Sequence, residues 1–325
     1  MAGQLRAVKR RIVSVQSTKK ITRAMELIAS SRIIKAQRRV EAARPYAEMM
    51  RELMASVGRN AGNVDHPLLK QRDEVGTVGL IVISADRGLA GAYNSNLLRT
   101  AERDMREHRD TRLFASGKKA IGYFRFRGYD LAGEWQGFSE QPSIENAREV
   151  ANGAVEAFTN GEVDEVRIVY TRFESMLTQR PVVRKLIPAP REEFEETEGE
   201  GGPHANYEFE PEPEEILGYL LPRYIEGAVL QGMLEAAASE QAARRRAMKA
   251  ATDNADELIE NLTRVYNQAR QAEITTEIME VIGGAEALSQ GGDETDRGMT
   301  MPHRQSGTTI VRATTNGENV RIPGG

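Results

Sequence analysis

The stretch MELIASSRIIKAQRRVEAARPYAEMMRELMASV, residues 25–57, decides the fold. Its apolar or small residues recur at spacings of three and four, at Met25, Ala29, Ile33, Ala36, Val40, Ala43, Ala47, Met50, Met54 and Val57. This pattern is the seam of a coiled coil, which is narrower than the buried face of a globular helix. Pro45 predicts a kink or a local irregularity within it. Gly58 begins a run rich in Gly and Asn that should end the helix.

A second seam of the same kind fills the C-terminal part of the chain, in a helix that Glu214 opens. Its members are Met248, Ala251, Ala255, Leu258, Leu262, Val265, Ala269, Ala272, Thr276, Met279 and Gly283, preceded by Leu230, Leu234, Ala237, Gln241 and Arg244. At 1.5 Å per residue, helices over 216–289 and 3–57 would be roughly 110 and 80 Å long. A compact domain of about 115 residues, with a radius of gyration near 13 Å, cannot cover either of them.

The two seams are therefore predicted to pack on each other as a long antiparallel coiled coil that projects beyond the rest of the chain. Small seam residues bury little area, at about 25 cal/mol per Å². A two-helix rod of this kind is marginal alone, so it should be held by surrounding protein partners.

Between the helices, residues 76–190 alternate strand and helix patterns. Val78–Ser84 is a continuous apolar run, as in a buried parallel strand. Further strands are expected at 111–115, 129–135, 163–173 and 179–187, and helices at 94–108, 118–127 and 143–159, with Asn94 and Ser143 as N-caps. The fold class is therefore α/β plus a long antiparallel coiled coil, with a small Rossmann-like α/β domain in the centre.

The predicted organisation has five parts. They are an N-terminal coiled-coil helix at 1–60, a central α/β domain at 61–190, an acidic loop at 191–213, a C-terminal coiled-coil helix at 214–289 and a disordered tail at 290–325. Residues 1–58 hold 13 Lys or Arg against 4 acidic residues, and residues 191–215 hold one Arg against 11 acidic residues. Such segregation indicates different partners at different places.

Composition excludes several classes of site. The chain has no cysteine, which removes disulfides, thiolate metal sites and thiol nucleophiles, and its four histidines are isolated. No metal or cofactor is expected, and no stretch approaches the ~20 apolar residues of a membrane span. The basic first 25 residues could mimic an organelle transit peptide.

Two glycine-containing turns are possible nucleotide-binding loops. Asp86–Asn94 lies between a strand and a helix, where phosphate loops occur, but its spacing is G-x-x-G and it is interpreted as a tight turn. Ser116–Lys119 resembles the end of a P-loop, yet Arg112 stands where a glycine is needed. No group of residues in the sequence is a candidate for an enzyme active site. On the last helix, Arg270 and Gln271 could grip carboxylates of a partner.

Specific motifs then resemble the gamma subunits of F-type ATP synthases. They are ITRAMELIASSR at 21–32, SADRGLAGAYN at 84–94, AMKAATDNA at 247–255 and ARQAEITTEIMEVIGGA at 269–285, supported by shorter blocks at 207–211, 220–224 and 239–244. The resemblance runs from about Gly3 to Leu288. It implies a non-catalytic central rotor shaft that transmits torque between the proton-driven c ring and the beta catalytic sites, and so couples proton translocation to ATP synthesis.

The resemblance also implies partners and contacts. The partners are three alpha and three beta subunits, epsilon and the c ring, with no direct nucleotide binding and a location on the cytoplasmic side of the bacterial plasma membrane. The implied beta-subunit contacts are Met25, Arg244, Arg270, Gln271, Thr275 and Glu277, and the implied c-ring contacts are Tyr207 and Glu210. Motif matching from Gly3 argues against a transit peptide.

Two departures from the family and two alternatives remain. Ala90 stands where many relatives have Cys, and 36 residues follow position 289, where the family usually ends; we expect this tail to leave the apolar bearing without plugging it. The basic N-terminal helix is also compatible with a coiled-coil nucleic-acid-binding protein. A nucleotide-binding α/β enzyme with helical arms is the third hypothesis.

Overall fold

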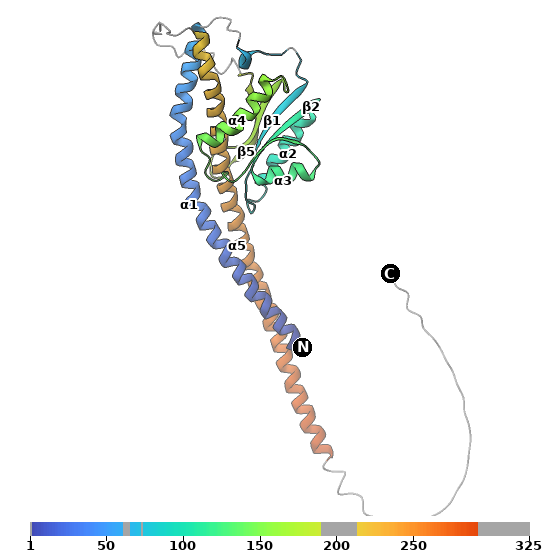
Figure 1. Ribbon diagram of the computed structural model, residues 1–325. Coiled ribbons are helices and arrows are strands. Elements are labelled where there is room, and N and C mark those ends of the chain that lie inside the picture. Colours follow the sequence, from blue (N-terminus) through green and yellow to red (C-terminus); the bar gives the residue numbers. More distant parts are fainter. Residues whose placement is uncertain (1, 61–65, 73, 190–212, 292–325) are drawn as a thin grey trace, which may run out of the picture. The chain divides into compact units, whose positions relative to one another are not determined.

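The computed structural model describes residues 2–60, 66–72, 74–189 and 213–291 (Figure 1). The chain comprises two units, Arg6–Val265 and Met1–Leu5 with Tyr266–Gly325, and each is considered by itself. The expected acidic loop and nearly all of the expected tail lie outside the described residues. Within the described ranges, no helix has both the length and the apolar character that crossing a membrane requires.

A five-stranded sheet forms the centre of the first unit. Its strands are β1 (Thr77–Ile83), β2 (Asp110–Ser116), β3 (Leu131–Trp135), β4 (Glu165–Phe173) and β5 (Gln179–Ile187). Their order is β3-β2-β1-β4-β5, parallel except for the antiparallel β4–β5 hairpin. The strand patterns read from the sequence are thus confirmed, including the buried central strand β1.

The helices between the strands are α2 (Tyr93–Arg106), α3 (Lys118–Phe126) and α4 (Ile144–Thr159), with a short 3-10 turn η1 (Pro67–Leu69) before β1. Ser143 caps α4 as expected: its side chain accepts a hydrogen bond from Asn146 N–H, and the Asn146 side chain accepts one from Ser143 N–H. The expected cap at Asn94 is wrong. Asn94 lies inside α2, and its Oδ1 instead accepts a hydrogen bond from Ala85 N–H, 3.1 Å away.

Alternate residues of β1 enter two separate cores, because successive side chains point to opposite faces of a strand. Leu80 and Val82 pack with apolar residues of α2 and α3. Ile81 and Ile83 pack with α4 and with the two long helices, α1 (Ala2–Asn60) and α5 (Pro213–Gly291). The sheet is therefore covered on both faces, and the long helices contribute to one of its cores.

Within residues 6–265, α1 and α5 lie side by side and run in opposite directions (Figure 1). Ala36 and Val40 of α1 pack with Leu234 and Ala238 of α5. Nearer the N-terminus, the hydroxyl oxygens of Thr22 and Thr252 are 2.8 Å apart. Contacts at 22 with 252 and at 36–40 with 234–238 establish the antiparallel direction.

The buried stripe of α1 follows the predicted seam. Ala29, Ile33, Ala36, Val40, Met50 and Met54 are all buried. The helix is continuous through Pro45. Towards the N-terminus the stripe passes through Glu26 and Thr22, which are 7% and 8% exposed, while Met25 is only half-buried.

Beyond Met248 the stripe of α5 follows the predicted seam only in part. Leu258 and Val265 were expected on it, but they are 39% and 49% exposed. Ala251, Ala255 and Leu262 of the predicted seam are buried or half-buried as expected, and Thr252 and Ile259 join the stripe beside them. Spacings of three and four fit two adjacent registers, and the contact between Thr252 and Thr22 selects the second one.

Candidate functional site

The candidate site lies at the carboxyl ends of β1 and β4, where α5 meets the sheet. In an open α/β sheet with this strand order, the neighbouring connections of these two strands run to opposite sides, which leaves a crevice that often binds ligands. Here α5 lies across the crevice. Ser239 Oγ donates to Thr171 O over 3.0 Å, and Tyr93 Oη donates to Ala236 O over 3.2 Å.

Asp86 joins the loops that follow three of the parallel strands. Its carboxylate accepts hydrogen bonds from the backbone N–H groups of Lys118, Gly137 and Ser139, at 2.9 to 3.1 Å. Burial alone would raise the pKa of Asp86, but these N–H donors outweigh burial and hold the pKa below its ordinary value. Asp86 therefore serves as an ionised brace for the edge of the sheet.

Arg244 ties α5 to the loop after β1. Its Nη2 lies 2.6 Å from Glu240 Oε1 and 3.2 Å from Gly88 O. The side chains of Arg244 and Glu240 are only 7% and 1% exposed. Burial raises the pKa of Glu240, whereas the charge and hydrogen bond of Arg244 lower it. Each partner of this pair would be a costly buried charge without the other.

Glu140 connects the same loop to α1. One of its carboxylate oxygens is 2.6 Å from Arg32 of α1, and the other is 3.4 Å from Arg87. We call the set Arg32, Asp86, Arg87, Glu140, Glu240 and Arg244 the junction bracket. It links both long helices to the loops at the carboxyl end of the sheet.

The loop of the junction bracket has an unusual backbone. Leu89 has a φ of 61° and is 63% exposed. A left-handed conformation is costly for a leucine, so the surrounding structure must impose it. Gly91 has a φ of 58°, which glycine adopts without strain. The segment Asp86–Asn94 is thus a strand-to-helix turn held by protein groups, as the interpretation of its spacing predicts.

Protein groups likewise occupy the turn after β2. A Cβ at Gly117, where φ is 97°, would lie 2.2 Å from Ser84 O. Ser84 Oγ donates toward Ser116 O and accepts a hydrogen bond from Ala120 N–H. The glycine in the segment that resembles a P-loop is therefore needed for close packing against the end of β1.

The implied subunit contacts fall in both units. In the first unit, Met25 is half-buried on α1 and Arg244 is buried inside the junction bracket. In the second unit, Arg270, Gln271, Thr275 and Glu277 are exposed on α5, and Thr275 Oγ1 donates to Gln271 O over 2.9 Å. Tyr207 and Glu210 lie outside the described residues.

Sequence reasoning missed half of the junction bracket. It singled out Arg244 and the turn beginning at Asp86, but not Arg32, Glu140 or Glu240. A buried Glu and Arg at positions i and i+4, inside a helix whose other seam residues are small, was an available signal for the pair Glu240–Arg244.

Residues 4–288 match one protein family, described as ATP synthase. The ATP synthase gamma chains of Frankia casuarinae and of a Parafrankia species are 52% and 50% identical over 299 residues, and each alignment covers 90% of this chain and 100% of the relative. The gamma chain of Mycolicibacterium smegmatis is 50% identical over 309 residues, covering 89% of this chain and 99% of the relative.

Solved structures with a similar fold include the rotor of the Euglena gracilis mitochondrial ATP synthase, with a TM-score of 0.59, 19% identity, and coverage of 84% of this chain and 100% of the other. A central stalk and c-ring structure from Tetrahymena thermophila has a TM-score of 0.53 and 24% identity, with 71% and 99% covered. These likenesses give no support to the nucleic-acid-binding alternative. The chain belongs to the ATP synthase family, among its gamma chains.

Proposed function

We propose that this chain is the central rotor shaft of an F1Fo ATP synthase and carries torque between a proton-driven c ring and the beta catalytic sites. The observation that carries the proposal is the end-to-end match to gamma chains at about half identity. The antiparallel contacts of α1 and α5 support it, because two helices that pack by small residues along one stripe build a coiled-coil rod.

In this function the chain performs no bond chemistry. It is an asymmetric ligand that turns inside a ring of alternating alpha and beta subunits. Because it makes different contacts with each beta subunit, it changes the relative free energies of their conformers. A difference in contacts between conformers is the only means by which such a ligand can shift their populations.

The exposed surface of α5 in the second unit is suited to contact with surrounding subunits. Large apolar side chains that are 52% to 72% exposed gather there, namely Ile278, Met279, Val281 and Ile282. Contiguous exposed apolar surface on a helix marks an interaction site. We assign it to the apolar inner wall of the alpha–beta ring.

The proposed polar contacts with the beta subunits are Arg270, Gln271, Thr275 and Glu277, all of which are exposed and free to reach a partner. Met25 is the proposed contact on α1. Arg244 acts indirectly in this proposal, since its enclosed guanidinium positions the Gly88 carbonyl and the loop around it.

We also propose that Tyr207 and Glu210 contact the polar loops of the c ring and that epsilon binds nearby. The proposed location is the cytoplasmic side of a bacterial plasma membrane, as a peripheral component. No nucleotide, metal or nucleic acid takes part in this role.

The test is a double substitution, Arg270→Ala with Gln271→Ala, in the assembled complex. Loss of two polar contacts, one of them charged, should lower proton-coupled ATP synthesis by roughly tenfold. The matched control is Arg264→Ala with Gln268→Ala, which removes the same residue types from the preceding turns of α5 and should change synthesis little. Unchanged synthesis in the first variant would mean that the contact residues are misassigned.

The rotor assignment itself is tested by co-purification. The chain should leave detergent-free membrane washes together with alpha and beta subunits. Retention on nucleic acid that weakens with salt, in the absence of those subunits, would contradict the assignment.

A further inference from the structure

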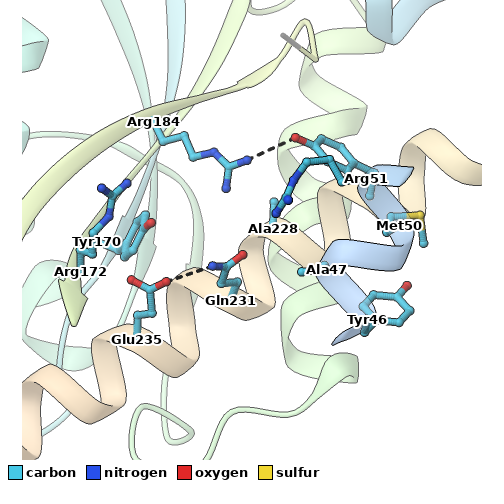
Figure 2. Close-up of a pocket in the computed structure, with 12 residues that line it drawn as sticks. Tyr46, Ala47, Met50, Arg51, Tyr170, Arg172, Arg184, Ala228, Gln231 and Glu235 are labelled. Carbon is cyan, nitrogen blue, oxygen red and sulfur yellow. Dashed lines mark hydrogen bonds between the residues drawn. The ribbon is translucent and has the colours of Figure 1, made fainter. Parts of the chain in front are cut away.

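A second feature of the first unit is a cavity of about 350 Å³ between α1, the β4–β5 hairpin and α5 (Figure 2). This volume lies at the lower end of the range for small-ligand sites. Gly227 helps to shape it, because a Cβ there would lie 3.3 Å from the ring of Tyr46, which lines the same cavity.

Three arginines from three different elements line the cavity. Arg51 comes from α1, Arg172 from β4 and Arg184 from β5. Figure 2 shows them around the opening. Arg184 also donates to the hydroxyl of Tyr224 over 3.2 Å. Neither Arg51 nor Arg172 forms an ion pair with another described residue.

The one carboxylate of the lining is already engaged by other groups. Glu235 is 7% exposed, accepts a hydrogen bond from Gln231 Nε2 over 3.0 Å, and accepts a longer one of 3.4 Å from Phe173 N–H. Burial raises the pKa of Glu235, while Arg172 and Arg184 draw it down. The two positive charges of Arg51 and Arg172 together outweigh the single negative charge of an ionised Glu235.

We propose that this cavity binds a small oxyanion of the phosphate class, held by Arg51, Arg172 and Arg184. A guanidinium presents paired N–H groups that match two oxygens of a phosphate, and it remains charged at all relevant pH values. The hydroxyl of Tyr170 stays neutral, because burial raises its pKa, and is a further donor at the wall. This inference does not depend on the rotor function.

The chain itself contains a competing source of negative charge. Six glutamates lie between residues 192 and 200, in the segment between β5 and α5. The experiment must therefore separate a bound phosphate from the carboxylates of this segment.

The experiment is calorimetric titration of the full-length chain with pyrophosphate at low ionic strength, with sodium chloride at equal ionic strength as the blank. We expect one saturable site per chain. Arg51→Gln and Arg172→Gln should each weaken binding by about tenfold or more, since a hydrogen bond to a charged group is lost. Both side chains are exposed, so the thermal midpoint of the chain should not change.

The matched control is Arg103→Gln, which makes the same charge change on the exposed face of α2, an element that does not line the cavity. It should bind pyrophosphate within about twofold of the unmodified chain, because general charge effects at a distance are screened. Three results would overturn the proposal: no saturation, equal weakening by the control, or binding that is detected only after residues 192–200 are deleted.

Discussion

The guanidinium of Arg244 lies 3.2 Å from the carbonyl oxygen of Gly88, and its ion pair with Glu240 holds it there. One contact therefore fixes α5 to the loop after the central strand. With Glu140 between Arg32 and Arg87, both long helices are attached to the same edge of the sheet. A torque applied to the sheet would reach the helices through this edge.

Replacing Arg244 with Met should destabilise the chain by about 3–5 kcal/mol, because Glu240 would be left as an unpaired buried charge. Urea unfolding measures this change. Adding Glu240→Met should recover most of the loss. Arg264→Met is the control, since Arg264 pairs with Glu260 on the exposed surface of the same helix. Unfolding of the two arginine variants at the same urea concentration would contradict a stabilising role for the buried ion pair.

Asp86→Asn should lower stability at pH 7 by about 1–3 kcal/mol, since at least one backbone N–H loses its carboxylate acceptor. The pKa of Asp86 is depressed in the folded chain, so its contribution is complete above its ordinary value of 3.8 and is lost as pH falls through the folded pKa. The gap between variant and parent should therefore close in acid. The control is Asp130→Asn, at an exposed position just before β3, which should change stability at pH 7 by about 0.5 kcal/mol or less.

Gly117 and Gly137 provide a matched pair for separating a clash from backbone strain. Their φ values are 97° and 98°, but only Gly117 has atoms where a Cβ would go, with Ser84 O at 2.2 Å. Gly137→Ala should cost about 1–2 kcal/mol from conformation alone. Gly117→Ala should cost clearly more and shift the thermal midpoint further. Equal midpoints would show that the end of β1 can move aside.

The hydroxyls of Thr22 and Thr252 meet between α1 and α5, 2.8 Å apart and buried. A double-mutant cycle with Thr22→Val and Thr252→Val should give single losses of about 1 kcal/mol and a coupling of roughly half that or more. Thr18→Val is the control, because Thr18 has a backbone hydrogen bond of the same kind on the exposed side of α1. Strict additivity in the cycle would argue against a direct contact.

Local patterns predicted the elements of this fold well. The apolar run of β1, the Ser143 cap and the seam of α1 from Ala29 to Met54 depend on neighbouring residues, and each is found as expected. Asn94 was wrongly predicted as an N-cap, because an asparagine side chain can either cap a helix or hold a loop in place. Only the position of Ala85 in space distinguishes them.

Neither the register of α5 nor the residues of the junction bracket could be predicted from local sequence patterns. Leu258 looked like a seam residue because spacings of three and four tolerate a shift by one position, and the partner helix decides between them. Glu140 meets Arg32 across 108 positions of sequence, so nothing near either residue indicates the pair. The sequence alone marks the helices, whereas their attachment to the sheet depends on tertiary contacts.

The pairing of Thr22 with Thr252 has a consequence for biosynthesis. The two residues are 230 positions apart, so the stripe of α1 leaves the ribosome long before the part of α5 that packs on it has been translated. At 5–20 residues per second, the wait is roughly 10–50 s. During that interval the stripe of α1 that will pack on α5 is uncovered, and exposed apolar surface of this kind makes an incomplete chain prone to aggregation.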